Sequence, residues 1–334
     1  MSQIDRRRFL RLSGLSLGAG ALYRAFPALA RGSEAGEAGE AAETGRRLAL
    51  ANGEAPRPFT FVQLSDTHVG FQGPPNPTGT KAFERAVEVV NALDPLPELV
   101  LFTGDLSHDS EKPGEHAARM KAFREIASRL RVPTVKMVPG EHDAGLDGGA
   151  LFREHFGETS QAFDHRGVHF VGLDNVSRAH PEVGAERVAW LRRDLERFPR
   201  TTPIVVFTHR PLFDLKPEWE WFTSDGDAVM NVLAPYENVT VLYGHIHREN
   251  DHTIGRSRHL AARSLIFSFP DPDKVADKAP LAFSPDRPLK NLGLRLVHRS
   301  ASGGLDLGAS DVELSLAERS GTEGQLSMLR PSSL

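Results

Sequence analysis

The stretch Leu99-Val100-Leu101-Phe102-Thr103-Gly104-Asp105 is an apolar run that ends in a glycine and a carboxylate. A near-continuous apolar run of this length predicts a β-strand in a sheet that is covered on both faces. Similar runs recur along the chain and alternate with segments whose apolar residues have helical spacing. This alternation predicts an α/β layered domain.

The other expected elements begin at Pro58 and are found by working outward from this run. Strands are expected at Phe59–Leu64, Leu99–Thr103, Thr134–Val138, Val168–Leu173, Ile204–Thr208 and Val239–Tyr243. Helices are expected at Lys81–Leu93, Ala117–Leu130 and Ala185–Phe198. Beyond Ser264 the pattern weakens. We expect a loop over Pro270–Pro288, then a terminal hairpin of Gly293–His298 and Leu305–Leu316 that closes one sheet edge.

The composition excludes several classes of protein and of chemistry. The 334 residues include 40 Lys and Arg against 44 Asp and Glu, a formal net charge of −4. That balance argues against a polycationic protein, and no nucleic-acid-binding surface is expected. The chain has no cysteine, which excludes disulfides, zinc fingers, iron–sulfur clusters and thiol nucleophiles. Any metal must therefore be held by nitrogen and oxygen ligands.

Residues 1–30 have the order of features found in an export signal. A basic cluster with Arg6-Arg7 precedes a weakly apolar stretch, and Ala28-Leu29-Ala30 offers a small-x-small cleavage site. The paired arginines followed by Phe9-Leu10 resemble the twin-arginine signal. We therefore expect the twin-arginine translocase to be a partner during export. A periplasmic or secreted location follows, with no stable membrane anchor after cleavage.

The rest of the chain divides into two parts. Residues 31–57 are rich in Gly, Ala and Glu and lack an apolar period, which predicts a flexible linker. Residues 58–334 contain all the expected strands and helices. They are therefore expected to form the functional domain.

Polar clusters follow five of the expected strands. They are Asp66 with His68; Asp105; Glu141 with His142 and Asp143; His209; and His245 with His247. Ligands of open α/β sheets bind beyond the carboxyl ends of the strands, so these clusters are expected to converge. In an extended segment, residues two apart point the same way, as the Asp66–His68 and His245–His247 pairs would. Gly104 and Gly244 would let the backbone turn sharply there.

The clusters offer seven ligands of the types that transition metals accept. Four are imidazoles and three are carboxylates: His68, His209, His245, His247, Asp66, Asp105 and Glu141. Such a set suits two metal ions about 3.5–4 Å apart, bridged by a carboxylate. Each residue alone could instead be a helix cap, turn or core residue. A one-metal hydrolase or oxygenase is a further alternative, although it would leave several ligands unused.

The ordered set resembles the calcineurin-like metallophosphoesterases, especially their bacterial cyclic-nucleotide and glycerophosphodiester phosphodiesterase branch. The matching motifs are Asp66-x-His68, Gly104-Asp105, Gly140-Glu141-His142-Asp143, His209 and Gly244-His245-x-His247. The resemblance implies that residues 58–334 form a four-layer αββα sandwich of the metallo-dependent phosphatase type. It also implies an enzyme that hydrolyses phosphate mono- or diesters by attack of a metal-activated hydroxide. Its cofactors would be two ions of Fe, Mn or Zn, and its partner a small phosphoester substrate.

The same resemblance implies a role for each position of the motif. The first metal would take Asp66, His68 and His247, Asp105 would bridge, and the second metal would take Glu141, His209 and His245. His142 would meet the substrate, and Asp143 would orient its ring. His108 stands where purple acid phosphatases have a tyrosine, and it is a candidate substrate contact, as is Arg210.

Glu141 departs from the family pattern, which has asparagine at this position. A glutamate keeps the ligand oxygen but adds a negative charge and removes the NH₂ donor. With two divalent ions, three carboxylates and a hydroxide, the net charge of the centre would be zero. With asparagine at position 141 it would be +1. We expect either one trivalent ion such as Fe(III), or a preference for the less anionic diester over the monoester. The alternative function is a catalytically silent metal-binding interaction protein on the same fold.

Overall fold

The computed structural model describes residues 58–299 and 307–317. The expected signal at 1–30 and the linker at 31–57 lie outside these residues, so export and the domain boundaries stay predictions. Within the described ranges, no helix has both the length and the apolar character needed to cross a membrane.

Two mixed β-sheets form the centre of the described chain. The first has the order β11-β10-β1-β2-β3 and the second the order β4-β5-β6-β7-β9-β8. The first sheet comprises β1 (Phe59–Leu64), β2 (Leu99–Thr103), β3 (Thr134–Val138), β10 (Gly293–Arg299) and β11 (Leu307–Glu313). The second comprises β4 (Gln161–His165), β5 (Val168–Gly172), β6 (Ile204–Phe207), β7 (Val239–Tyr243), β8 (Asn250–Ile254) and β9 (Ser257–Ala261). Strands β1, β2 and β3 are parallel, as are β5, β6, β7 and β9.

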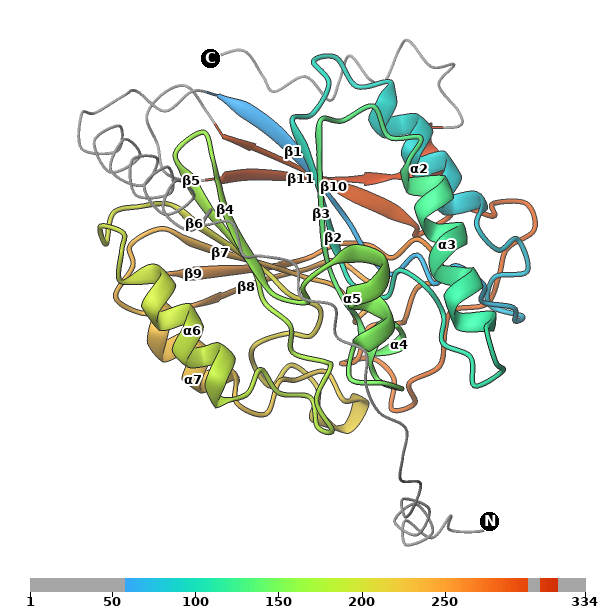
Figure 1. Ribbon diagram of the computed structural model, residues 1–334. Coiled ribbons are helices and arrows are strands. Elements are labelled where there is room, and N and C mark those ends of the chain that lie inside the picture. The colour runs from blue at the N-terminus through green and yellow to red at the C-terminus, as the bar shows by residue number, and fades with distance from the viewer. Residues whose placement is uncertain (1–57, 300–306, 318–334) are drawn as a thin grey trace, which may run out of the picture. The chain divides into compact units, whose positions relative to one another are not determined.

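Helices cover the outer face of each sheet (Figure 1). The helices of the described chain are α2 (Lys81–Asn91), α3 (Glu115–Ala127), α4 (Glu141–Ala144), α5 (Ala150–Phe156), α6 (Ala185–Leu195), the 3₁₀ turn η2 (Pro217–Trp219), α7 (Gly226–Leu233) and α8 (Leu314–Ala317). Helices α2 and α3 pack on the first sheet, whereas α6 and α7 pack on the second.

Alternating side chains along β1 explain why its sheet needs cover on both faces. Phe59 and Phe61 belong to the core between the two sheets, while Val62 and Leu64 belong to the core under α2 and α3. Successive residues of a strand point to opposite faces, so an apolar run supplies both cores. The predicted four-layer αββα sandwich is therefore confirmed.

Most of the predicted elements are present, with helix ends that differ by a few residues. Strands β1, β2, β3 and β7 have the predicted bounds, and the terminal hairpin is confirmed by β10 and β11 at the sheet edge. Three strands were missed, namely β4, β8 and β9. The sequence of β8, Asn-Asp-His-Thr-Ile, is polar because β8 is an edge strand and its side chains are half-buried or exposed.

Candidate metal centre

The structure brings the five polar clusters together beyond the carboxyl ends of the parallel strands. The described chain has four groups of side chains whose ligand atoms lie within 4.8 Å of one another, and two of these groups contain the seven predicted metal ligands. The first group is Asp66, His68, Asp105 and His247, and the second is Glu141, His209 and His245. All seven predicted metal ligands are therefore adjacent, although their role as ligands stays a prediction.

Asp105 lies between the two groups. Its Oδ2 atom is 3.2 Å from Nε2 of His68 and 3.3 Å from Nε2 of His209. In the first group, Oδ1 of Asp66 is 3.3 Å from Nε2 of His247. One carboxylate oxygen that faces both groups is the arrangement a bridging ligand needs.

Glu141 spans the second group from the start of α4. Its Oε2 atom is 2.7 Å from Nε2 of His209, and its Oε1 atom is 2.8 Å from Nδ1 of His245. Arg210 Nη2 approaches the same Oε1 atom at 3.6 Å. Burial opposes ionisation here, but the charges of His245, His209 and Arg210 hold the pKa of Glu141 well below its usual range. Glu141 is therefore a carboxylate at neutral pH.

Backbone carbonyls determine which ring nitrogen of three histidines faces the centre. Nδ1 of His209 lies 2.7 Å from the Thr103 carbonyl, Nδ1 of His247 2.9 Å from the Phe267 carbonyl, and Nε2 of His245 3.1 Å from the Glu220 carbonyl. A carbonyl only accepts, so each of these nitrogens must donate its N–H. The other nitrogen of a neutral ring then turns its lone pair toward the carboxylates, as in metal-ligating histidines.

The contact between His209 and Glu141 shows that these residues fit a cation. Nε2 of His209 and Oε2 of Glu141 are buried and lie 2.7 Å apart, and neither has another hydrogen-bond partner in the described ranges. Burial lowers the pKa of His209, but Asp105 and Glu141 together raise it well above its usual value. In the metal-free protein a proton would hold these atoms together, and a metal ion would release it. Imidazole and carboxylate ligands suit Mn, Fe or Zn.

The backbone at five of the predicted ligands is left-handed. The φ angles are 55° at Asp66, 40° at His68, 50° at Asp105, 67° at His245 and 50° at His247. The predicted extended conformation of the Asp66–His68 and His245–His247 pairs is therefore wrong. Such residues cost about 1–3 kcal/mol each and cluster at functional sites. Both pairs face the candidate centre because tight turns direct their side chains toward it, and not because a strand continues through them.

Two glycines allow the ligand-bearing loops to approach one another. At Gly104, where φ is +94°, a Cβ atom would lie 2.3 Å from Nδ1 of His209. At Gly244, a Cβ atom would lie 2.0 Å from Oγ of Ser65 and 2.7 Å from Oδ2 of Asp66. Any larger residue at these positions would push the candidate ligands apart.

Asp143 does not orient His142, which corrects the sequence-based expectation. Its carboxylate accepts backbone N–H groups from Gly140 at 3.0 Å and from residues 106 and 107 at 2.9 Å each. Near the first turn of a helix a carboxylate reaches back to free N–H groups, and this turns Asp143 away from its neighbour. Instead, Oδ1 of Asp109 is 2.5 Å from Nδ1 of His142. Asp109 was missed because no strand end or spacing rule marks it.

The two candidate substrate contacts named from the sequence both lie at the centre. The rings of His108 and His142 stack with centroids 4.5 Å apart, and Nδ1 of His108 is 3.2 Å from Nδ1 of His68. Burial, with the charges of His142 and His68, lowers the pKa of His108 to about 4. For His142, burial lowers the pKa, but the charge of Asp105 and the hydrogen bond that Nδ1–H donates to Asp109 raise it to about 9. Arg210, by contrast, contacts Glu141.

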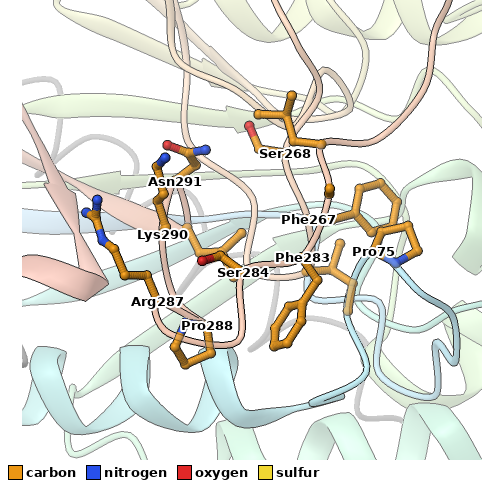
Figure 2. A pocket seen from close by; sticks show the side chains of 13 residues that line it. Pro75, Phe267, Ser268, Phe283, Ser284, Arg287, Pro288, Lys290 and Asn291 are labelled. Carbon is orange, nitrogen blue, oxygen red and sulfur yellow. The ribbon is translucent and has the colours of Figure 1, made fainter.

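A cavity of about 250 Å³ shares Phe267 with the candidate centre. The Phe267 ring lies 4.6 Å from that of His247, centroid to centroid. Figure 2 shows Pro75 and Phe267 on one side of the cavity and Arg287 and Lys290 on the other. Among the described residues that line it, none is acidic. The cavity therefore suits a neutral or anionic group.

This sandwich and its ligand groups define the class of metal-dependent phosphoesterases. Residues 59–249 match the calcineurin-like phosphoesterase family, and the chain belongs to that family. A probable glycerophosphodiester phosphodiesterase of Arcobacter nitrofigilis is 28% identical over 201 residues, which cover 56% of this chain and 71% of that protein. A probable cyclic nucleotide phosphodiesterase of Rhodopseudomonas palustris is 31% identical over 207 residues, with the same two coverages.

Two solved structures share the fold. A dimetal phosphatase from Danio rerio has a TM-score of 0.51 at 14% identity, over 77% of this chain and 99% of that one. A purple acid phosphatase from yellow lupin has a TM-score of 0.56 at 12% identity, over 78% of this chain and 52% of that one. At such identities the likeness concerns the fold alone.

Proposed function

We propose that this chain is an exported phosphoesterase with a binuclear metal centre, which hydrolyses phosphate diesters or monoesters. The observation that carries the binuclear centre is the position of Asp105, whose Oδ2 atom faces both ligand groups at nearly equal distance. The names of the two bacterial relatives favour a diester. The cofactors would be two ions of Fe, Mn or Zn.

The seven side chains would hold the ions in the two groups that the geometry defines. Asp66, His68 and His247 would hold the first, Glu141, His209 and His245 the second, and Asp105 both. A bound pair of such ions lowers the pKa of water and neutralises phosphoryl oxygens, which is the chemistry that ester hydrolysis needs. The chain's own part is to fix the positions of the ligands. The Thr103, Phe267 and Glu220 carbonyls do this by holding three of the imidazole rings.

His142 would act on the substrate rather than on the ions. Its ring packs edge-on against that of His68 with centroids 4.8 Å apart, while Asp109 holds Nδ1. Since its pKa is raised to about 9, the ring is protonated at neutral pH and Nε2 carries a proton. That N–H would donate to a phosphoryl oxygen or to the departing alkoxide.

Elemental analysis combined with ester assays tests this function. We expect the purified protein to bind two equivalents of Mn²⁺ and to hydrolyse bis(p-nitrophenyl) phosphate or p-nitrophenyl phosphate. His142→Ala should keep both ions but lose about 10²–10⁴-fold in kcat, whereas Asp105→Ala should lose metal as well. A silent interaction protein would hydrolyse neither ester at any pH. Full activity of Asp105→Ala would exclude the bridging role.

The export proposal rests on the sequence of residues 1–30 alone. Its test is a fusion of these residues to a reporter that becomes active only after folded export. The paired substitution Arg6→Lys and Arg7→Lys should abolish export, because the twin-arginine route reads that pair. Export that persists in this variant would indicate another route.

A further inference from the structure

Glu141 carries a negative charge at a position where the family resemblance expects a neutral asparagine, and the structure places one arginine against it. Arg210 Nη2 lies 3.6 Å from Oε1 of Glu141. The arginine is 8% exposed, so its charge is not held in open solvent. Glu141 is half-buried, with 27% of its side chain exposed, and a buried cation beside it interacts more strongly than a pair on the surface does.

Arg210 is held in place from both its backbone and its side chain. Its backbone N–H donates to Oδ1 of Asn175 at 3.3 Å, and its carbonyl accepts from Nδ2 of the same asparagine at 2.9 Å. Its Nη1 donates to the Glu220 carbonyl at 2.9 Å. That carbonyl also accepts from His245, whose other ring nitrogen contacts Glu141. The arginine is thus part of the network around Glu141, which makes it a poor candidate for a mobile substrate contact.

We propose that Glu141 and Arg210 form one functional unit, in which the arginine cancels the charge of the glutamate and so keeps the centre attractive to an anionic phosphate ester. Two divalent ions and three carboxylates would leave a charge of +1, and Arg210 raises it to +2. A neutral amide in place of Glu141, with no arginine, would give the same +2. A trivalent ion is therefore unnecessary, and Glu141 alone sets no preference for diesters. This inference rests on the proposed function.

A double-mutant cycle tests the unit, with Arg210→Gln and Glu141→Asn made singly and together. Mn²⁺ affinity is measured by titration calorimetry and ester hydrolysis by kcat and KM. Without the neighbouring cation, the Arg210→Gln variant should bind Mn²⁺ at the site that contains Glu141 about tenfold more tightly, and its KM for the ester should rise about tenfold. In the Glu141→Asn background, the same substitution should change the Mn²⁺ affinity less than about twofold. Equal effects in both backgrounds, or weaker Mn²⁺ binding, would overturn the unit.

Arg248→Gln is the matched control. Arg248 also follows a candidate ligand histidine, but it donates to the Pro270 carbonyl and lies 3.5 Å from Asp271. Its replacement should leave Mn²⁺ affinity and KM unchanged within about twofold. Arg210→Lys, which keeps the charge, should keep the wild-type Mn²⁺ affinity as well. If Arg210→Lys changed the Mn²⁺ affinity and KM as much as Arg210→Gln does, the shape of the side chain and not its charge would be responsible.

Thermal unfolding of the metal-free protein separates this inference from the proposed function. Arg210→Gln should lower Tm by about 3 °C or more, because it leaves the half-buried carboxylate of Glu141 with one cation fewer. The drop should be much smaller in the Glu141→Asn background. If the wild-type protein bound no Mn²⁺, the proposed function would be wrong. The Tm values of the metal-free variants would still show whether Glu141 and Arg210 interact. Equal drops in the two backgrounds would overturn the pairing itself.

Discussion

Two neighbouring acidic side chains at the candidate centre have different tasks. Asp143 holds the loop after β2 to the start of α4 through three backbone N–H groups. Burial, followed by the charge of Asp105, raises its pKa to about 7 despite these hydrogen bonds. Asp109 instead faces His142. One aspartate therefore supports the architecture of the site, and the other contacts the histidine proposed to act on the substrate.

Asp109→Asn should change the pH dependence of turnover. Asp109 raises the pKa of His142, so its loss lowers that pKa and deprotonates the ring at a lower pH. The alkaline limb of the kcat profile should move to lower pH, with kcat at pH 8 reduced about 10- to 100-fold and the metal content unchanged. Steady-state kinetics from pH 5 to about 10 measure this.

Asp143→Asn is the control for this prediction. It removes one acceptor oxygen from three backbone N–H groups, so it should lower the free energy of unfolding by about 1–3 kcal/mol. The alkaline limb should stay in place. A shift in this variant and none in Asp109→Asn would restore the orienting role first expected for Asp143.

Gly104→Ala should disturb the centre more than its backbone conformation alone would predict. Both Gly104 and Gly79 have positive φ, but a Cβ at Gly79 meets no atom of the described chain within 4 Å, whereas one at Gly104 collides with His209. Gly79→Ala should cost about 1–2 kcal/mol in stability and keep the metal content. Gly104→Ala should cost more and lose at least one ion, as chemical denaturation and elemental analysis would show. Equal metal contents would contradict the steric argument.

At the scale of elements, His169 links two strands of the second sheet and a helix that covers it. From β5 its ring contacts Asp164 of β4 and Asp194 of α6, each at 2.6 Å. Burial lowers the pKa of His169, but the hydrogen bonds that its ring donates to both carboxylates raise it above its usual value. The histidine thus joins an edge strand and a covering helix to the sheet through its charge.

This link predicts a pH-dependent stability. Because the folded-state pKa of His169 is raised, its contribution is complete below the unfolded value of about 6.5 and is lost as the pH rises through the folded value. His169→Gln should remove this component. The difference in free energy of unfolding between wild type and variant should therefore shrink from pH 6 to about 9. Urea denaturation at several pH values measures it, and a constant difference would contradict the link.

At the scale of the whole described chain, the candidate centre joins the two sheets. Asp66, Asp105 and Glu141 follow strands of the first sheet, whereas His209 and His245 follow strands of the second. Bound ions would therefore connect ligand-bearing loops of the two sheets. Binding to the folded state alone stabilises it by mass action.

Removal of metal should consequently destabilise the whole domain and not only the site. With Mn²⁺ at about 100 times its Kd, binding at one site raises the free energy of unfolding by about 2.7 kcal/mol. Tm should fall on addition of EDTA and recover with Mn²⁺, as differential scanning calorimetry would show. In Asp105→Ala both additions should have little effect. A wild-type Tm that does not change on addition of EDTA would argue against a metal that joins the two sheets.

The layered fold and the seven candidate ligands could be predicted because their signals are local. An apolar run specifies a buried strand, and the polar residue after it lies at a sheet edge wherever the strand pairs. The polar edge strand β8 could not be predicted in this way. Its five residues lack an apolar alternation, and only its register against β9 makes them a strand.

The sequence by itself determined which candidate ligand types are present, their order along the chain and the layers that carry them. Only the tertiary structure decided that Asp109 contacts His142, that Arg210 faces Glu141, and that left-handed turns direct the candidate ligands toward one another. The physical reason is the range of the interactions. Strand patterns repeat every two residues, whereas these contacts join loops far apart in the chain, where side-chain direction depends on backbone turns that no spacing encodes.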